Sequence, residues 1–124
     1  MLDTHTLLWM QDNHPSLSEN STKILTDGNN HLYVSIASFW EIAIKQSLKK
    51  LELSYSLDEL ELACSRSGVK ILPVCVSDLD VLKNLPFIHR DPFDRLIIST
   101  AINHSFSVIS KDEHFQKYDL GVIW

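Results

Sequence analysis

Four acidic residues stand where predicted strands end, and their type and placement could support metal chemistry. They are Asp3 after a very short first strand, Glu41 early in the helix after the second strand, Asp94 at the start of a later helix, and Asp112 just after the strand Phe106–Ser110. In open α/β sheets, ligands bind in the crevice outside the carboxyl ends of the strands. We therefore expect the four carboxylates to converge on one end of a sheet if their strands are neighbours.

Carboxylates that are crowded together without enough basic partners repel one another. Divalent cations that prefer oxygen ligands, such as Mg²⁺ or Mn²⁺, relieve this repulsion. A bound cation lowers the pKa of an attacking water and neutralises the charge that develops on phosphorus during phosphodiester hydrolysis. The acidic cluster therefore predicts a metal-dependent nuclease site.

Each of these acids, taken alone, also has a purely structural interpretation. Asp3 could be the N-cap of a helix over Thr4–Met10, because its carboxylate can accept hydrogen bonds from the first free N–H groups. Asp94 could be a first-turn acid that favours the helix dipole, with Asp91 as the cap.

The other two acids have similar alternatives. Glu41 could be the last residue of a capping box that Ser38 opens. Asp112 could be a solvated turn residue. The functional interpretation depends on all four acids occupying equivalent strand ends.

Short apolar runs with β character alternate with longer stretches of helical period along the chain. Such alternation predicts a parallel sheet with helices on its faces. The expected strands are Leu32–Ser35, Val69–Pro73, Phe106–Ser110 and Gly121–Trp124. Only Met1 and Leu2 precede Asp3, so the first strand is expected to be very short.

Capping residues mark the boundaries of the predicted helices. Ser56 and Glu59 have the spacing of a capping box, and Gly68 suits the left-handed backbone that ends a helix. Asp91 is expected to cap a helix with Pro92 at its first position. The remaining helices are expected from Thr4, from Ser18 to Gly28, from Ser38 to the basic Lys45, Lys49 and Lys50, and from Ser77 to the turn at Pro86.

The composition is that of one globular domain over residues 1–124. Hydrophobic residues make up 44% and charged residues 22% of the chain, ordinary values that exclude a disordered chain or a coiled coil. The three glycines are too scattered for a phosphate-binding glycine loop, and Cys64 and Cys75 lack the spacing of a zinc site. No apolar stretch approaches the roughly 20 residues of a membrane span. We therefore expect a cytoplasmic protein that does not contact a membrane.

The charge is unevenly distributed between the two halves of the chain. The net charge is −5, and residues 1–62 hold all of the excess, with 4 lysines against 9 acidic residues. A nucleic-acid binder that relied on its overall charge would be basic. Any nucleic acid must therefore be bound at a local site, together with cations.

Four segments in this order resemble the PIN-domain family, and most closely its VapC-like members, the toxins of type II toxin–antitoxin pairs. The segments are Leu2–His5, Val34–Lys45, Leu85–Ile97 and Val108–Asp112. The match runs over nearly the whole chain. The match is specific because all four segments occur together and in order; each segment alone is only a weak signal for the family.

The resemblance implies a three-layer α/β/α fold with a five-stranded, largely parallel sheet and a ribonuclease activity that depends on Mg²⁺ or Mn²⁺. By position, Asp3, Glu41 and Asp94 match the three core acids of the family, and Asp112 matches the fourth. In such a site the acids coordinate one or two metals, and a metal-bound water attacks the RNA phosphate. The family also implies a small antitoxin protein that blocks the site, so the chain is expected to be an endoribonuclease toxin.

Basic residues flank the acids and could contact substrate phosphates. The candidates are Arg90, Arg95 and Lys111, although Arg95 could equally pair with Asp91 at the i,i+4 spacing of a helix. The lysines at 45, 49 and 50 are interpreted as the exposed end of a helix.

Histidine and aromatic residues near the acids have two interpretations as well. His5 and His89 could aid proton transfer, but a lone histidine more often packs or forms a structural hydrogen bond. Trp40, Phe39 and Phe93 could stack on bases, but aromatic residues on apolar helix faces usually belong to the core.

Two other functions stay open. One is a non-catalytic PIN-like module that binds a protein partner without cutting. The other is an Asp-based phosphatase similar to haloacid dehalogenases, but the pattern D-x-D-x-T is broken here because His5 and Leu7 take its third and fifth positions.

The apolar run Leu7–Met10 is longer than one helix face buries. It could form a contact with an antitoxin or a second copy of the chain as a homodimer, or it could be core.

Overall fold

Four short parallel strands and one bridging residue form the sheet of the computed structural model, which describes residues 1–124. The strands are β1 (Leu32–Ser35), β2 (Val69–Leu72), β3 (Val108–Ile109) and β4 (Val122–Ile123). β1 pairs with β2 and β3 pairs with β4, both in parallel. Leu2 joins the two pairs through parallel bridges to Val34 and Ile109. The order is therefore β2, β1, Leu2, β3, β4.

The structure has four strands and not the expected five, because the segment between β1 and β3 is reduced to a bridge at Leu2. Asp3 already serves as the N-cap of the next helix, so only Leu2 bridges to both neighbours. The backbone nevertheless keeps sheet-like hydrogen bonds there, from Leu2 N–H to the Tyr33 carbonyl at 2.7 Å and from Ile109 N–H to the Met1 carbonyl at 2.8 Å.

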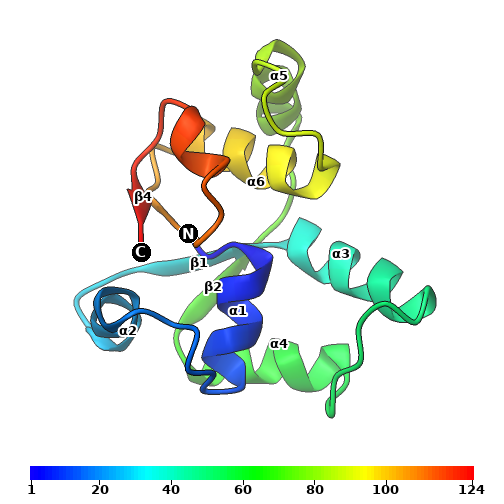
Figure 1. The fold of residues 1–124 in the computed structure, drawn as a ribbon, viewed down its shortest axis with the longest axis vertical. Coiled ribbons are helices and arrows are strands. Elements are labelled where there is room, and N and C mark those ends of the chain that lie inside the picture. Colours follow the sequence, from blue (N-terminus) through cyan, green and yellow to red (C-terminus); the bar gives the residue numbers. More distant parts are fainter.

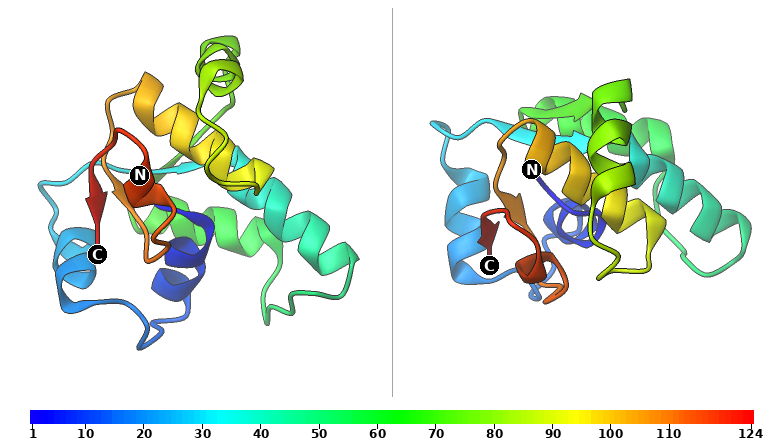
Figure 2. Two further views of the ribbon diagram at one scale, coloured as in Figure 1. Left: turned by 45° about the horizontal axis from the view of Figure 1, so that its top comes forward. Right: turned by 90° about the horizontal axis from the view of Figure 1, so that it is seen from above.

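Six α-helices and one turn of 3-10 helix surround the strands. They are α1 (Thr4–Gln11), α2 (Glu19–Thr26), α3 (Ile36–Ser47), α4 (Leu57–Arg66), α5 (Val76–Asn84), α6 (Pro92–Asn103) and η1 (Phe115–Lys117). Figure 1 shows α1 and α4 on one side of the strands and α5 and α6 on the other. Figure 2 shows that α5 packs beside α6. The fold is the expected three-layer α/β/α arrangement.

Successive side chains of a strand point to opposite faces of the sheet and therefore pack into two separate hydrophobic cores. Leu32 and Val34 join the cluster that contains Ile42 of α3 and Leu60 of α4. Tyr33, between them, packs against the second cluster, which includes the buried α6 residues Ile97, Ile98 and Ala101. Each face of the sheet is therefore sealed by its own set of helices.

Several helix boundaries are as predicted. Ser56 and Glu59 form a reciprocal capping box at the start of α4, and Gly68 after that helix has a φ of +70°, which a residue without a side chain adopts readily. Asp91 caps α6, because its carboxylate accepts from the N–H groups of Phe93 and Asp94.

Two predicted helix starts are wrong by a few residues. α3 begins at Ile36 with Ser35 as its N-cap, not at a capping box opened by Ser38, because the hydroxyl that ends β1 already accepts from Ala37 N–H. α5 begins at Val76, and its cap comes from Asp78, which accepts from the N–H of Cys75, rather than from Ser77.

The apolar run in α1 is mostly core. Leu7 and Leu8 are buried, whereas Trp9 and Met10 are half-buried. The alternative interpretation of this run as core is therefore correct for its first two residues.

None of the helices is long and apolar enough to cross a bilayer.

Candidate active site

The carboxyl ends of β1, Leu2 and β3 lie side by side because these segments are neighbours and parallel. β1 continues directly into α3, Leu2 into α1, and β3 into the turn that contains Asp112. α6 packs against α3, so its first turn brings Asp94 to the same edge. The fold thus assembles the four predicted acids from four different elements.

Asp3 is buried and acts both as a helix cap and as part of the acidic cluster. One carboxylate oxygen accepts from the N–H of Thr6 at 2.6 Å, and the other accepts from the hydroxyl of Ser110. Burial raises the pKa of Asp3, while these hydrogen bonds act in the opposite direction. The N-cap interpretation of Asp3 is therefore confirmed, and its role as a metal ligand stays a prediction.

Glu41 is buried on α3, with 2% of its surface exposed. Its carboxylate accepts from the hydroxyl of Thr4 and pairs with the ammonium of Lys45 one turn further along the helix. The capping-box role with Ser38 is wrong, because Glu41 lies in the interior of α3. Lys45, which the sequence placed on an exposed helix end, instead neutralises part of this buried charge.

A histidine bridges the remaining two acids. His89 Nε2 lies 3.0 Å from an oxygen of Asp94 and 3.2 Å from an oxygen of Asp112. The N–H of Asp91 donates to His89 Nδ1 at 3.1 Å. Because Nδ1 accepts, the neutral imidazole carries its proton on Nε2 and donates it to the carboxylates.

The electrostatics show that the acids are close enough to interact. Burial, followed by the charges of Asp91, Glu41, Asp3 and Asp112, raises the pKa of Asp94 to about 8. Partial burial also raises the pKa of Asp112, but hydrogen bonds from His114 and His89 outweigh it and hold that pKa below its ordinary value. The site therefore concentrates negative charge that the surrounding basic residues do not fully compensate.

The donor set at this edge suits a hard divalent cation. Four carboxylates offer oxygen ligands, and the raised pKa of Asp94 shows that they repel one another when ionised. A second group, formed by His89, Asp112 and His114, has ligand atoms within 4.8 Å of one another. His89 Nε2 is less suited to a metal, because its proton points to the acids in the observed hydrogen-bond pattern.

The three predicted substrate-contact residues lie in different surroundings. Lys111 is exposed, with its Nζ 6.0 Å from the centre of the Trp9 ring, near Asp3 and Asp112. Arg90 is exposed and forms no ion pair. Arg95 is buried and donates to the carbonyls of Pro86 and Leu85 at 2.8 and 3.2 Å.

Arg95 therefore corrects two expectations. It forms no ion pair with Asp91, and its guanidinium is committed to the loop before α6 rather than turned to the acids. The physical reason is that the carbonyl of the buried Leu85 needs a donor, and a planar guanidinium has enough donors to bind this carbonyl and that of Pro86 together. A phosphate contact by Arg95 would require this loop to open.

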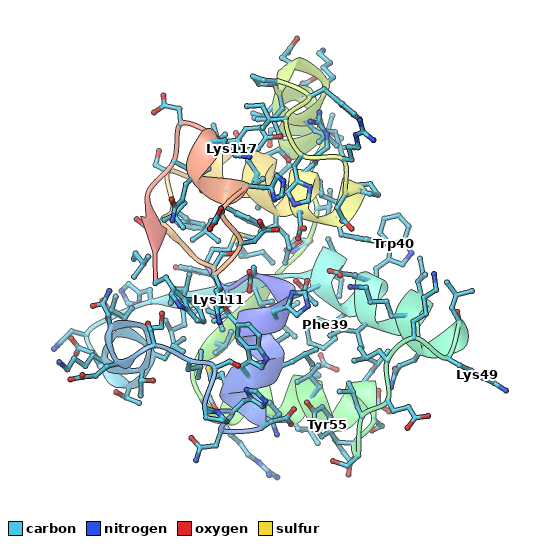
Figure 3. The ribbon with its side chains drawn as sticks, viewed as in Figure 1. Phe39, Trp40, Lys49, Tyr55, Lys111 and Lys117 are labelled. Atoms are coloured by element: carbon cyan, nitrogen blue, oxygen red, sulfur yellow. The ribbon has the colours of Figure 1, made fainter.

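The candidate aromatic residues divide between core and surface. Phe39 is buried. Trp40 is 58% exposed, and its ring meets that of Phe93 edge-on with centroids 4.9 Å apart. Figure 3 shows Trp40 beside the start of α3, well apart from Lys111.

Sequence reasoning missed four residues that orient the acids: Thr4, Lys45, Ser110 and His114. The i,i+4 spacing of Glu41 and Lys45 is a signal that could have found the ion pair. Thr4 and Ser110 carry no such signal, because single hydroxyl groups beside acids are common and only the tertiary contact reveals their role.

Comparison with known proteins agrees with this geometry. The family model of the PIN domain matches residues 1–120. The chain belongs to the PIN-domain family. No curated protein matches its sequence.

Two solved structures share the fold of this PIN domain. VapBC2 from Rickettsia felis, solved bound to a DNA fragment from its promoter, matches with a TM-score of 0.72 and 19% identity, covering 99% of this chain and 96% of that chain. FitAcB from Neisseria gonorrhoeae matches with a TM-score of 0.64 and 19% identity, covering 99% of this chain and 95% of that chain. The PIN domain thus has relatives of the same fold that span nearly its whole length.

Proposed function

We propose that this PIN domain is a metal-dependent endoribonuclease and the toxin of a toxin–antitoxin pair. PIN domains are generally nucleases. The observation that carries the proposal is the convergence of Asp3, Glu41, Asp94 and Asp112 on one edge of the sheet. There, burial and then the neighbouring negative charges raise the pKa of Asp94 to about 8.

The four acids would hold Mg²⁺ or Mn²⁺, which bind oxygen ligands. When bound, such a cation lowers the pKa of water and offsets charge that develops on the phosphate. The chain's own residues orient the ligands: Thr6 N–H and the Ser110 hydroxyl position Asp3.

Hydrogen bonds and ion pairs from the chain's own residues also orient Glu41, Asp94 and Asp112. The Thr4 hydroxyl and the Lys45 ammonium hold Glu41. His89 holds the side chains of Asp94 and Asp112, and it is placed to exchange a proton with a group that reacts beside them.

A small antitoxin is the proposed protein partner. Both structural neighbours are described as two-component assemblies, VapBC2 and FitAcB. This chain also exposes apolar side chains that a protein partner could cover on α5 and the following loop, with Val76 77% and Phe87 74% exposed. A second copy of the chain is the other proposed occupant of this surface.

The test is cleavage of single-stranded and structured RNA by the purified protein in Mg²⁺, Mn²⁺ or EDTA. Asp94→Asn removes one carboxylate from the cluster and is expected to abolish cleavage while the protein stays folded. Asp80→Asn is the matched control, because Asp80 is exposed on α5 and pairs only with Lys83. A contaminating ribonuclease would act equally in all three preparations.

Cation-dependent cleavage that Asp94→Asn loses and Asp80→Asn keeps supports the nuclease. No cleavage of any RNA by folded protein free of antitoxin contradicts it and favours the binding-module alternative.

A further inference from the structure

A pocket of about 260 Å³ opens directly beside two of the acids. It is lined by Asp3, His5, Trp9, Lys111 and Asp112. Trp9 is its single hydrophobic residue. The pocket therefore places one aromatic ring and one cationic side chain next to the carboxylates.

Three other aromatic rings lie around the ring of Trp9. Its centroid lies 5.7 Å from that of His5, 6.0 Å from that of His14 and 5.6 Å from that of Trp124. His14 stacks nearly parallel to it, at 19°, whereas Trp124 is tilted by 58°. Trp9 is half-buried among these rings, so it has fewer orientations to lose than an exposed side chain when a ligand binds to it.

The ammonium group of Lys111 lies over the same ring and has no acidic partner. Its Nζ lies 6.0 Å from the ring centroid, at the outer limit of cation–π attraction. The side chain is exposed and forms no ion pair. Figure 3 shows Lys111 above α1, at the turn that follows β3. The ammonium is therefore free to turn to an anionic group that enters the pocket.

We propose that Trp9 and Lys111 form a nucleotide subsite, in which a nucleobase beside the scissile phosphate stacks on the indole and Lys111 contacts a phosphate oxygen. The proposal rests on the ribonuclease function and adds the residues that would select the form of the substrate. Stacking on an aromatic ring tolerates any base, because every base has a π face. Bases in single-stranded RNA are accessible for such stacking, so the subsite favours single strands over duplexes.

Trp40 is the matched control for the loss of an indole ring. It lies on α3, is more exposed than Trp9, and does not line the pocket. If any exposed tryptophan served as a stacking platform, Trp40 would contribute at least as much to RNA binding.

The experiment compares Trp9→Leu, Trp9→Phe, Trp40→Leu and Lys111→Gln with the unmodified protein. Fluorescence anisotropy in EDTA measures the affinity for a short labelled single-stranded RNA and for its duplex. Steady-state cleavage in Mn²⁺ then separates KM from kcat, and thermal unfolding checks the fold of each variant.

We expect Trp9→Leu to weaken single-strand binding by about 5- to 160-fold, the usual range for losing one base–aromatic stack. KM rises by a similar factor while kcat changes little. Trp9→Phe keeps most of the affinity because it keeps an aromatic face. Trp40→Leu behaves as the unmodified protein, and duplex binding is unchanged in all Trp9 variants.

Equal single-strand affinity and KM in Trp9→Leu and the unmodified protein overturn the subsite, even where metal-dependent cleavage is present. Should Trp9→Leu fail to fold, Lys111→Gln decides, because it changes an exposed side chain. It is expected to raise KM and to reduce the salt dependence of binding, and an unchanged KM contradicts the subsite.

Two further outcomes separate this inference from the proposed function. Absence of cleavage with Trp9-dependent binding of single strands refutes the nuclease and keeps the subsite. Loss of antitoxin binding in Trp9→Leu with unchanged RNA binding identifies a protein-binding pocket and overturns the nucleotide subsite.

Discussion

Asp94 is the acid whose ionisation the fold opposes most clearly. Burial and four neighbouring acids raise its pKa from 3.8 to about 8. Between these values the folded protein keeps a proton that the unfolded chain has released. The free energy of unfolding of the metal-free protein therefore falls as the pH rises from about 4 to about 8.

This linkage is tested by urea unfolding in EDTA across that pH range. Asp94→Asn cannot ionise, so we expect its stability to fall less with pH and to exceed that of the unmodified protein at pH 8. Asp80→Asn should keep the original slope. An identical slope in Asp94→Asn and the unmodified protein would show that Asp94 is not the titrating group.

Ser110 links two of the acids through one hydroxyl group. It donates to Asp3 and accepts from the N–H of Asp112 at 3.1 Å. Groups that orient metal ligands in this way typically contribute 10- to 100-fold to metal affinity. We expect Ser110→Ala to weaken Mn²⁺ binding by about this factor, as measured by isothermal titration calorimetry.

The control for this change is Ser47→Ala. The Ser47 hydroxyl donates only to the Ile44 carbonyl at the exposed end of α3, so its removal should leave Mn²⁺ affinity unaltered. If the two variants bind Mn²⁺ equally well, the Ser110 hydroxyl has no part in positioning the acids.

At the scale of elements, the placement of α6 depends on contacts at both ends of its first turn. Asp91 caps the helix and also donates its N–H to His89. Arg95 fastens the preceding loop to the helix through the carbonyls of Leu85 and Pro86. The first turn of α6, which carries Asp94, is thereby held against the ends of the strands.

Arg95→Met removes the donors but keeps much of the side-chain volume. The Pro86 carbonyl keeps its hydrogen bonds from Ile88 N–H and the Tyr118 hydroxyl, but the carbonyl of the buried Leu85 loses its donor. A buried carbonyl left without a donor costs about 1–3 kcal/mol, so we expect a loss of stability of this size in urea unfolding. Arg90→Met, at an exposed neighbouring position, should change stability little. A loss of cleavage with full stability would instead indicate that Arg95 contacts the substrate.

At the scale of the whole molecule, the site lies where separate parts of the chain meet. Asp3 and Ser110 are hydrogen-bonded across 107 residues of sequence, and Thr4 and Glu41 across 37. A cation that joins these acids would bind the folded state and not the unfolded chain. Its binding must therefore stabilise the whole fold.

We expect Mn²⁺ at about 100 times its dissociation constant to stabilise the protein by about 2.7 kcal/mol, seen as a rise in Tm by differential scanning calorimetry. The rise should be much smaller in Asp94→Asn. An equal rise in both proteins would mean that the cation binds elsewhere.

Much of the fold could be predicted from the sequence because its signals are local. The capping box at Ser56, the cap and proline at the start of α6, and the left-handed Gly68 each depend on a few adjacent residues. β1 has the predicted bounds Leu32–Ser35. The other three strands are shorter than predicted, for example β3 at Val108–Ile109, because apolar character alone does not mark where pairing with a neighbour stops.

By itself, the sequence determined that acids follow the strand ends. Both the positions of the acids and the alternation of strands and helices depend only on the order of residues along the chain. Only the tertiary structure decided what surrounds the acids other than Glu41: the His89 bridge, the Ser110 link, and the hydrogen bonds that direct Arg95 to the loop carbonyls and not to the acids. These are contacts between segments far apart in the chain or groups that become buried together, whereas the Glu41–Lys45 pair follows from the i,i+4 spacing within α3. Burial and repulsion arise only when the chain is folded, so the raised pKa of Asp94 belongs to the structure and not to the residue.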